Sequence, residues 1–191
     1  MLEDRWPPVY DAEDLAREIR QLTARPDFEK FFYEWRADRS IKLVDGVCQG
    51  DVVTLDSGVP VIAGDGHPGV ITNQTRMWLV LGNTCDFHRS VADVRWTQVA
   101  PLRNLGGTEL HPSVRDALRK YSQSRAFYVP PWEDAVETQY HAAELPLTVA
   151  IDKRAFTNSV RVQARLSRPA WILFNACLLR FVARDDGRFA E

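Results

Sequence analysis

The 191-residue sequence has few cysteines and no long apolar run. Its three cysteines, Cys48, Cys85 and Cys177, are too few and too scattered for a disulfide scaffold, and none lies at the spacing of a zinc site. The longest apolar run, residues 170–179, is interrupted by Asn175 and is too short to cross a membrane. We therefore expect no metal, no cofactor and no membrane contact.

An excess of charge of one sign is also lacking. The 24 basic and 26 acidic residues give a net charge of −2, so we expect no overall attraction to nucleic acid or to anionic membranes. This net charge does not exclude a local basic patch. Residues 1–19 begin with acidic side chains and contain no apolar core, which is unlike a secretory signal. These features predict a reduced, cytoplasmic protein.

The chain begins with helical patterns. Apolar residues three or four positions apart predict a helix from Asp11 to about Thr23, which Pro26 ends. A second short helix is expected to begin at Asp27. It carries the aromatic side chains of Phe28, Phe31, Phe32 and Trp35. This aromatic face either packs on the body of the domain or binds a protein partner or a second copy of the chain.

From residue 44 onward the apolar period changes to two, which is typical of strands. Strands are expected over residues 47–55, 59–62, 77–81, 94–102, 126–129, 148–151 and 160–166, with turn chemistry at 64–69 and a surface helix at 112–121. Ser167 and Pro169 predict the start of a last helix that extends to about residue 183. Because this helix is apolar nearly all round, we expect it to be buried against the sheet.

This order of elements predicts an α+β fold. Consecutive short strands with glycine-rich turns favour a small closed or half-open β-barrel, preceded by helices and followed by the buried helix. Residues 1–43 are expected to form a helical extension. Residues 44–191 are expected to form the barrel core with its C-terminal helix, all within one compact domain.

Three motifs follow one another in the middle of the chain. Gly50 and Asp51 open an apolar strand, Arg76 precedes the apolar run at 77–81, and the strand at 94–102 ends in the letters VAPL. In this order the motifs resemble the PemK/MazF-like small-barrel family, the fold of many bacterial toxin endoribonucleases. The resemblance covers about residues 50–102 and implies an SH3-like barrel.

The resemblance also implies a site. In that family an arginine before the second long strand stabilises the charge of the phosphorane, and a hydroxyl at the end of the next strand positions the phosphate. Arg76 occupies the arginine position, whereas Pro101, Leu102 and Arg103 occupy the hydroxyl position, so half of the site is absent. His67, in the preceding loop, is either an acid or base or plain turn surface.

Two roles follow from this resemblance. The first is a toxin-like or defence-associated module, endoribonuclease-like if it is an enzyme, which acts on RNA or another nucleic acid and contacts phosphate through Arg76. The second is a non-catalytic protein-interaction module on the same barrel. Both require the barrel to present Arg76 at an open cleft.

Three other segments, residues 79–87, 127–132 and 162–181, resemble a group of uncharacterised bacterial proteins with an N-T-C-D-type motif. This motif includes Cys85 and Asp86. They form, with His88, a second candidate site, because a cysteine nucleophile needs a nearby base and a carboxylate can orient the imidazole.

This second site leaves three hypotheses open. The chain is a cysteine-dependent enzyme, or these residues bind a substrate without covalent chemistry, or they only build a turn. In the last case Asn83, Thr84 and Asp86 make the turn, and Cys85 is a small buried hydrophobe.

A basic group lies near the C-terminus. Arg161 and Arg165 share a face of an extended strand, and Arg168 follows, so the three guanidinium groups are candidate contacts to a phosphate backbone. Asp152, Lys153 and Arg154 are interpreted as a charged turn. Cys48, on a strand, and Cys177, on the last helix, are expected in the core.

Overall fold

The structure is a computed structural model, and it describes residues 12–25, 28–33, 46–55, 59–62, 68–71, 77–106, 111–132 and 140–182. Among the residues named in the sequence predictions, Asp11, Pro26, Asp27, Trp35, His67 and Arg76 lie outside this part. The helices are α1 (Ala12–Thr23), η2 (Phe28–Phe31), α2 (Thr84–His88), α3 (Pro112–Arg119), η3 (Leu145–Leu147), α4 (Lys153–Ser159) and α5 (Arg168–Val182). The strands are β1 (Val52–Leu55), β2 (Val59–Ile62), β3 (Pro68–Ile71), β4 (Met77–Val80), β5 (Trp96–Asn104), β6 (Ala126–Val129), β7 (His141–Glu144), β8 (Val149–Asp152) and β9 (Val160–Ala164).

Strand β5 is the centre of a seven-stranded antiparallel sheet with the order β6-β7-β5-β4-β1-β9. Its middle pairs with β4, where Ala100 lies opposite Leu79, and its last residues pair with β7, where Leu102 lies opposite Ala143. Its first residues pair with β8. Strands β2 and β3 form a separate hairpin. The predicted α+β class is therefore confirmed.

The central residues of β1, β4 and β5 are buried on both faces of the sheet. Successive residues of a strand point to opposite faces, and here both faces are covered: Leu79 of β4 lies in one apolar cluster, while Trp78 and Val80 lie in another. We call the first the helix-side cluster. Besides residues of β1, β4 and β5, it includes Phe127, Ala143, Leu173 and Phe174. We call the second the α4-side cluster, formed by Val47, Val53, Trp78, Val80, Val99, Ile151 and Phe156.

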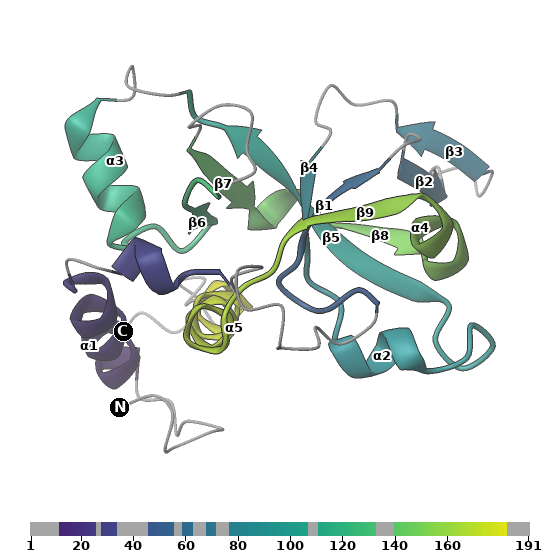
Figure 1. Ribbon diagram of the computed structural model, residues 1–191, viewed down its shortest axis with the longest axis horizontal. Helices are drawn as coiled ribbons and strands as arrows, with labels where there is room; N and C mark the ends of the chain where they lie inside the picture. The colour runs from purple at the N-terminus through teal and green to yellow at the C-terminus, as the bar shows by residue number, and fades with distance from the viewer. Residues whose placement is uncertain are drawn as a thin grey trace, which may run out of the picture.

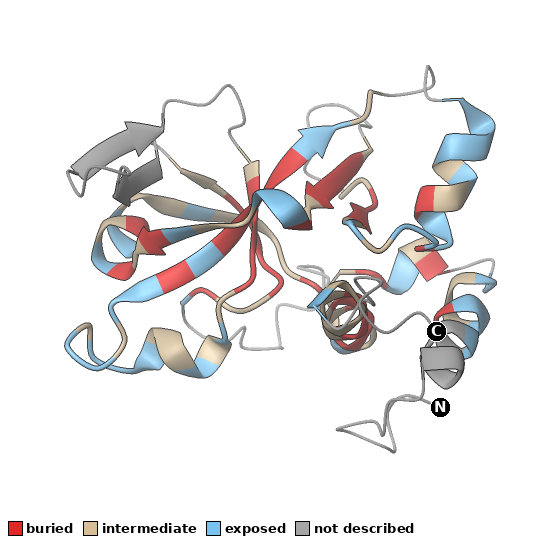
Figure 2. Ribbon diagram, turned by 180° about the vertical axis from the view of Figure 1, so that it is seen from behind, coloured by how far each residue is buried: buried red, intermediate tan, exposed pale blue. Residues whose placement is uncertain are grey.

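The helices gather at the two ends of the sheet (Figure 1). α1, η2 and α3 lie at one end with β6 and β7, whereas α2 and α4 lie at the other, and α5 lies below the middle. Seen from behind, buried residues follow the strands through the middle of the molecule, while exposed residues lie on the outer helices, in the loops and at parts of the strands (Figure 2).

Helix α5 begins as predicted. The Ala170 amide donates to Ser167 Oγ at 3.4 Å, so Ser167 caps the helix before Pro169 in the first turn. Its buried residues are Ala170, Ile172, Leu173, Phe174, Ala176 and Cys177. The predicted core position of Cys177 is thus confirmed, and burial raises the pKa of its thiol to about 12. Cys48, in contrast, is half-buried in the turn before β1 rather than on a strand.

The aromatic face splits between core and surface. Phe28 and Phe32 are buried, and the Phe32 ring packs at 5.6 Å from Phe28 and at 6.0 Å from Phe127. These two residues therefore pack on the body of the domain. Phe31, between them, is 52% exposed.

A closed barrel is not confirmed. Strands β9, β1, β4, β5 and β8 are successive neighbours, but in the part of the chain that the structure describes β8 and β9 do not pair with each other. Helix α4 connects them instead. Five elements were not predicted: β3, where turn chemistry was expected, and also α2, β7, η3 and α4.

Candidate functional site

The sheet brings three strand residues into one row at the end where β4 begins. Thr54 of β1 lies opposite Met77 of β4 on one side and opposite Arg161 of β9 on the other. Arg161 is exposed, and Gln163 Nε2 donates to Thr54 Oγ1 at 3.0 Å. Arg76 lies outside the described residues, but it is bonded to Met77 in the sequence. Because adjacent strands are separated by nearly 5 Å, the row places Arg161 ~10 Å from Met77, the residue that follows Arg76.

Arg165 has a different environment. Its guanidinium donates from Nε to Asp51 Oδ1 at 2.8 Å, and from Nη2 to Asp51 Oδ2 at 2.9 Å and to the Gly46 carbonyl at 2.7 Å. The Arg165 side chain is 11% exposed and the Asp51 side chain is fully buried. The Cys48 amide also donates to Asp51 Oδ2, at 2.8 Å. This bidentate pair joins the turn before β1 to the end of β9.

The electrostatics of this pair combine two opposed effects. Burial raises the pKa of Asp51 above its usual value, while the hydrogen bonds and charge of Arg165 act to lower it. The ionised carboxylate therefore has a desolvation cost that its partner only partly offsets. The geometry therefore gives Arg165 a structural role, in which it fixes the turn before β1 to the end of β9.

A bulge explains why Arg161 and Arg165 differ. Val52 lies opposite Ala164 but the next residue, Val53, lies opposite Val162, so β9 has one extra residue at this point. The extra residue breaks the alternation on which a shared face for Arg161 and Arg165 depended. Arg168, the first residue of α5, is exposed. The three arginines are thus divided between a sheet end, a buried ion pair and a helix start.

The second candidate site lies on the short helix α2. Asn83 caps it, because Asn83 Oδ1 accepts from the Cys85 amide at 3.0 Å. Cys85 is exposed, so the expectation of a buried hydrophobe is wrong. His88 is exposed as well, one helical turn further on.

The side chains of α2 do not form a linked triad. Among the described residues, no hydrogen bond joins the side chains of Cys85, Asp86 and His88. The Asp86 carboxylate instead lies 3.6 Å from Arg89 Nη1, in a largely exposed ion pair. The geometry therefore contains no base held against the thiol by hydrogen bonds.

Lys153 is the residue that sequence reasoning missed. The residue is 4% exposed, and its ammonium donates to the carbonyl oxygens of Asp86 at 2.7 Å and Arg89 at 2.6 Å. The cation thus satisfies carbonyls at the C-terminal end of α2 and fixes that helix to the start of α4.

The expectation of a charged turn over Asp152, Lys153 and Arg154 is therefore wrong. Asp152 Oδ1 accepts from the Arg154 amide at 3.0 Å and caps α4, which turns Lys153 inward. The pKa of Asp152 is held below its usual value, mainly by the hydrogen bond that its carboxylate accepts from Arg95 and also by the capping hydrogen bonds. The signal available in the sequence was Asp152, a residue type that often caps helices, placed four residues before the apolar Phe156.

We expect Lys153→Met to lower the free energy of unfolding by about 1.5–3 kcal/mol, because the variant keeps the apolar stem but leaves two carbonyls without their charged donor. Urea denaturation measures this loss, and amide hydrogen exchange should accelerate selectively in α2. Arg154→Met, at the exposed neighbouring position, is the control and should change stability by less than about 0.5 kcal/mol. Equal losses in both variants would contradict the anchoring role of Lys153.

The residues that the family resemblance assigned to a hydroxyl position belong to β5. Pro101 and Leu102 of β5 are buried, and Arg103 Nε lies 2.8 Å from Glu144 Oε1 of β7. These three side chains offer no group that could position a phosphate in the way a hydroxyl does.

Within the described ranges, no group of three or more His, Cys, Asp and Glu residues has the arrangement of a metal site. The same residues contain no helix that has both the length and the apolar character needed to cross a membrane. No protein-family model matches the chain, and no curated protein is significantly similar to it.

Proposed function

We propose that the chain is a PemK/MazF-like, nucleic-acid-directed module that contacts phosphate groups with Arg76 and Arg161. The barrel of this proposal consists of β9, β1, β4, β5 and β8, neighbours in that order. Its support is the α4-side cluster, to which β1, β4, β5 and β8 all contribute buried residues. A toxin-like or defence-associated role rests on the family resemblance alone.

The observation that carries the proposal is the row of Met77, Thr54 and Arg161 across three adjacent strands. It places Arg161 in the same row as Met77, the residue that follows Arg76 in the sequence. Arginine suits this task because its planar guanidinium can form two parallel hydrogen bonds with a phosphate.

The chemistry favours binding over hydrolysis. Stabilising a phosphorane needs positive charge, which Arg76 would supply, but efficient cleavage also needs the attacking and leaving groups to be positioned. Because Pro101 and Leu102 are buried, the group that does this in the resembling enzymes has no counterpart here. The site that we propose is therefore one for phosphate contact.

The test is binding of a fluorescein-labelled single-stranded RNA of mixed sequence, measured by fluorescence anisotropy over a range of salt concentrations. Arg76→Ala and Arg161→Ala should each weaken binding and reduce the slope of log K against log salt concentration by about 0.7, the value for one contact to single-stranded phosphate. The control, Arg125→Ala, changes an exposed arginine in the turn before β6 and should leave both values unchanged.

Two results would overturn the proposal: no salt-dependent binding by the unmodified protein, or unchanged slopes in both variants. The same samples are examined for RNA cleavage on a gel. Cleavage that disappears in Arg76→Ala would identify an endoribonuclease-like enzyme, whereas intact RNA with salt-dependent binding would identify a non-catalytic module.

A further inference from the structure

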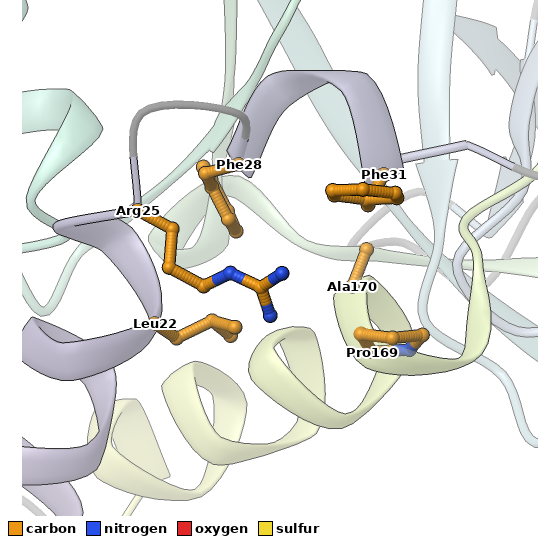
Figure 3. A pocket seen from close by; sticks show the side chains of 6 residues that line it. All are labelled: Leu22, Arg25, Phe28, Phe31, Pro169 and Ala170. Carbon is orange, nitrogen blue, oxygen red and sulfur yellow. The ribbon is translucent and has the colours of Figure 1, made fainter.

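A cavity of about 150 Å³ lies between the end of α1, η2 and the start of α5 (Figure 3). It is lined by Leu22, Arg25, Phe28, Phe31, Pro169 and Ala170. Five of these side chains are apolar. The sixth, Arg25, extends between Leu22 and Phe28 and brings its guanidinium into the space (Figure 3).

The size of the cavity limits what it can hold. A cavity of about 150 Å³ with aliphatic and aromatic walls holds one benzene-sized group. One wall is Phe31, which is 52% exposed, and the Arg25 guanidinium carbon lies 5.4 Å from the centre of its ring. The cavity therefore suits a single phenylalanine or leucine side chain that enters beside Phe31.

The charges next to the cavity are mainly positive. Besides Arg25, Lys30 precedes Phe31 and Arg168 precedes Pro169, and both are exposed. Glu29 follows Phe28, but Arg119 Nε at 2.8 Å and the Tyr128 hydroxyl at 3.1 Å both approach its carboxylate. Asp27, before Phe28, lies outside the described residues. The described part of the rim is thus complementary to negative charge.

We propose that this cavity docks one aromatic or leucine side chain of an acidic segment in a partner protein. The apolar walls would bind the side chain, and Arg25, Lys30 and Arg168 would face carboxylates on either side of it. Protein interfaces commonly combine a buried aromatic anchor with arginine in this way. The proposal does not depend on nucleic-acid binding, because it involves neither Arg76 nor Arg161.

The probe is a short fluorescein-labelled peptide with one phenylalanine flanked on both sides by glutamates, titrated with the full-length protein and followed by anisotropy. We expect saturable binding. Replacing the phenylalanine of the peptide with alanine, or its glutamates with lysines, should each weaken binding about tenfold or more, since each change removes one half of the recognition.

Two variants test the protein side. Phe31→Ala removes a wall of the cavity and Arg25→Glu reverses the charge at its rim, and each should weaken peptide binding about tenfold. Both positions are exposed, so the fold should be kept, which circular dichroism and thermal unfolding verify. Ala170→Met, which fills the cavity from α5, should also reduce binding. The matched control, Arg125→Glu, should bind like the unmodified protein.

Three results would overturn the proposal. They are no saturable binding to the unmodified protein, equal affinity for the glutamate and lysine peptides, and unchanged affinity in both Phe31→Ala and Arg25→Glu. Sedimentation equilibrium without peptide provides the remaining test. A dimer that Phe31→Ala dissociates would assign the cavity to a second copy of this chain and would also overturn the proposal.

Discussion

Replacing Asp51 with alanine is expected to lower the free energy of unfolding by about 3–5 kcal/mol, the range found when one partner of a buried ion pair is removed. The substitution leaves the Arg165 guanidinium in a site where it is only 11% exposed. It also removes the acceptor of the Cys48 amide. Arg165→Ala should have a loss of similar size, since it leaves a fully buried carboxylate. Urea denaturation measures both, with the slope m unchanged.

The exposed pair of Arg103 and Glu144 is a matched control. Its atoms are also 2.8 Å apart, but its side chains are 61% and 28% exposed, so Glu144→Ala should cost only about 0–1 kcal/mol. A double variant with Asp51→Leu and Arg165→Met should recover most of the loss, because an apolar pair removes the desolvation cost as well as the attraction. A double variant as unstable as the single ones would contradict this account.

Gly50→Ala is expected to cost about 2–5 kcal/mol for two reasons that add. Gly50 has a φ of +87°, which costs a residue with a Cβ about 1–2 kcal/mol. A Cβ at this position would also lie 2.8 Å from Cδ1 of buried Leu166, and relieving such crowding costs about 1–3 kcal/mol. The loss is measured by thermal and urea unfolding.

Gly106→Ala separates these two effects. Gly106 also has a positive φ, +75°, but a Cβ there would meet nothing within 4 Å. Its substitution should therefore cost only the conformational part, about 1–2 kcal/mol. Equal losses at Gly50 and Gly106 would show that crowding by Leu166 contributes nothing.

These two predictions give a physical reason for the adjacent glycine and aspartate that resemble the opening of a barrel strand. Gly50 is needed for its backbone angle and for the approach of Leu166, and Asp51 for the ion pair with Arg165. The motif marks a structural requirement of the fold whether or not the chain acts on nucleic acid.

Local patterns were sufficient for several elements. The apolar stretches at 59–62 and 126–129 became β2 and β6 with the expected bounds, and the serine and proline before residue 170 marked the start of α5. β7 was missed because its sequence, HAAE, has neither β-branched residues nor alternation. It is a strand because β5 and β6 pair with it on both sides.

The candidate sites were less predictable because long-range contacts determine them. Asp51 and Arg165 are 114 positions apart, and no local pattern relates them. The bulge in β9 depends on pairing with β1, so the faces of Arg161 and Arg165 could not be read from their spacing. The inward turn of Lys153 likewise depends on carbonyls of α2, more than 60 positions earlier in the chain.

The burial of the central residues of β1, β4 and β5 on both faces limits where this protein can acquire a ligand. The middle of the sheet offers no solvent-facing platform on which bases or peptides could stack. New contacts can arise where strands end, where helices meet, or on the exposed side of the β5–β8 pair, since changes there leave both apolar clusters intact. The row with Arg161, the short helix with Cys85 and the cavity beside Phe31 all occupy such margins.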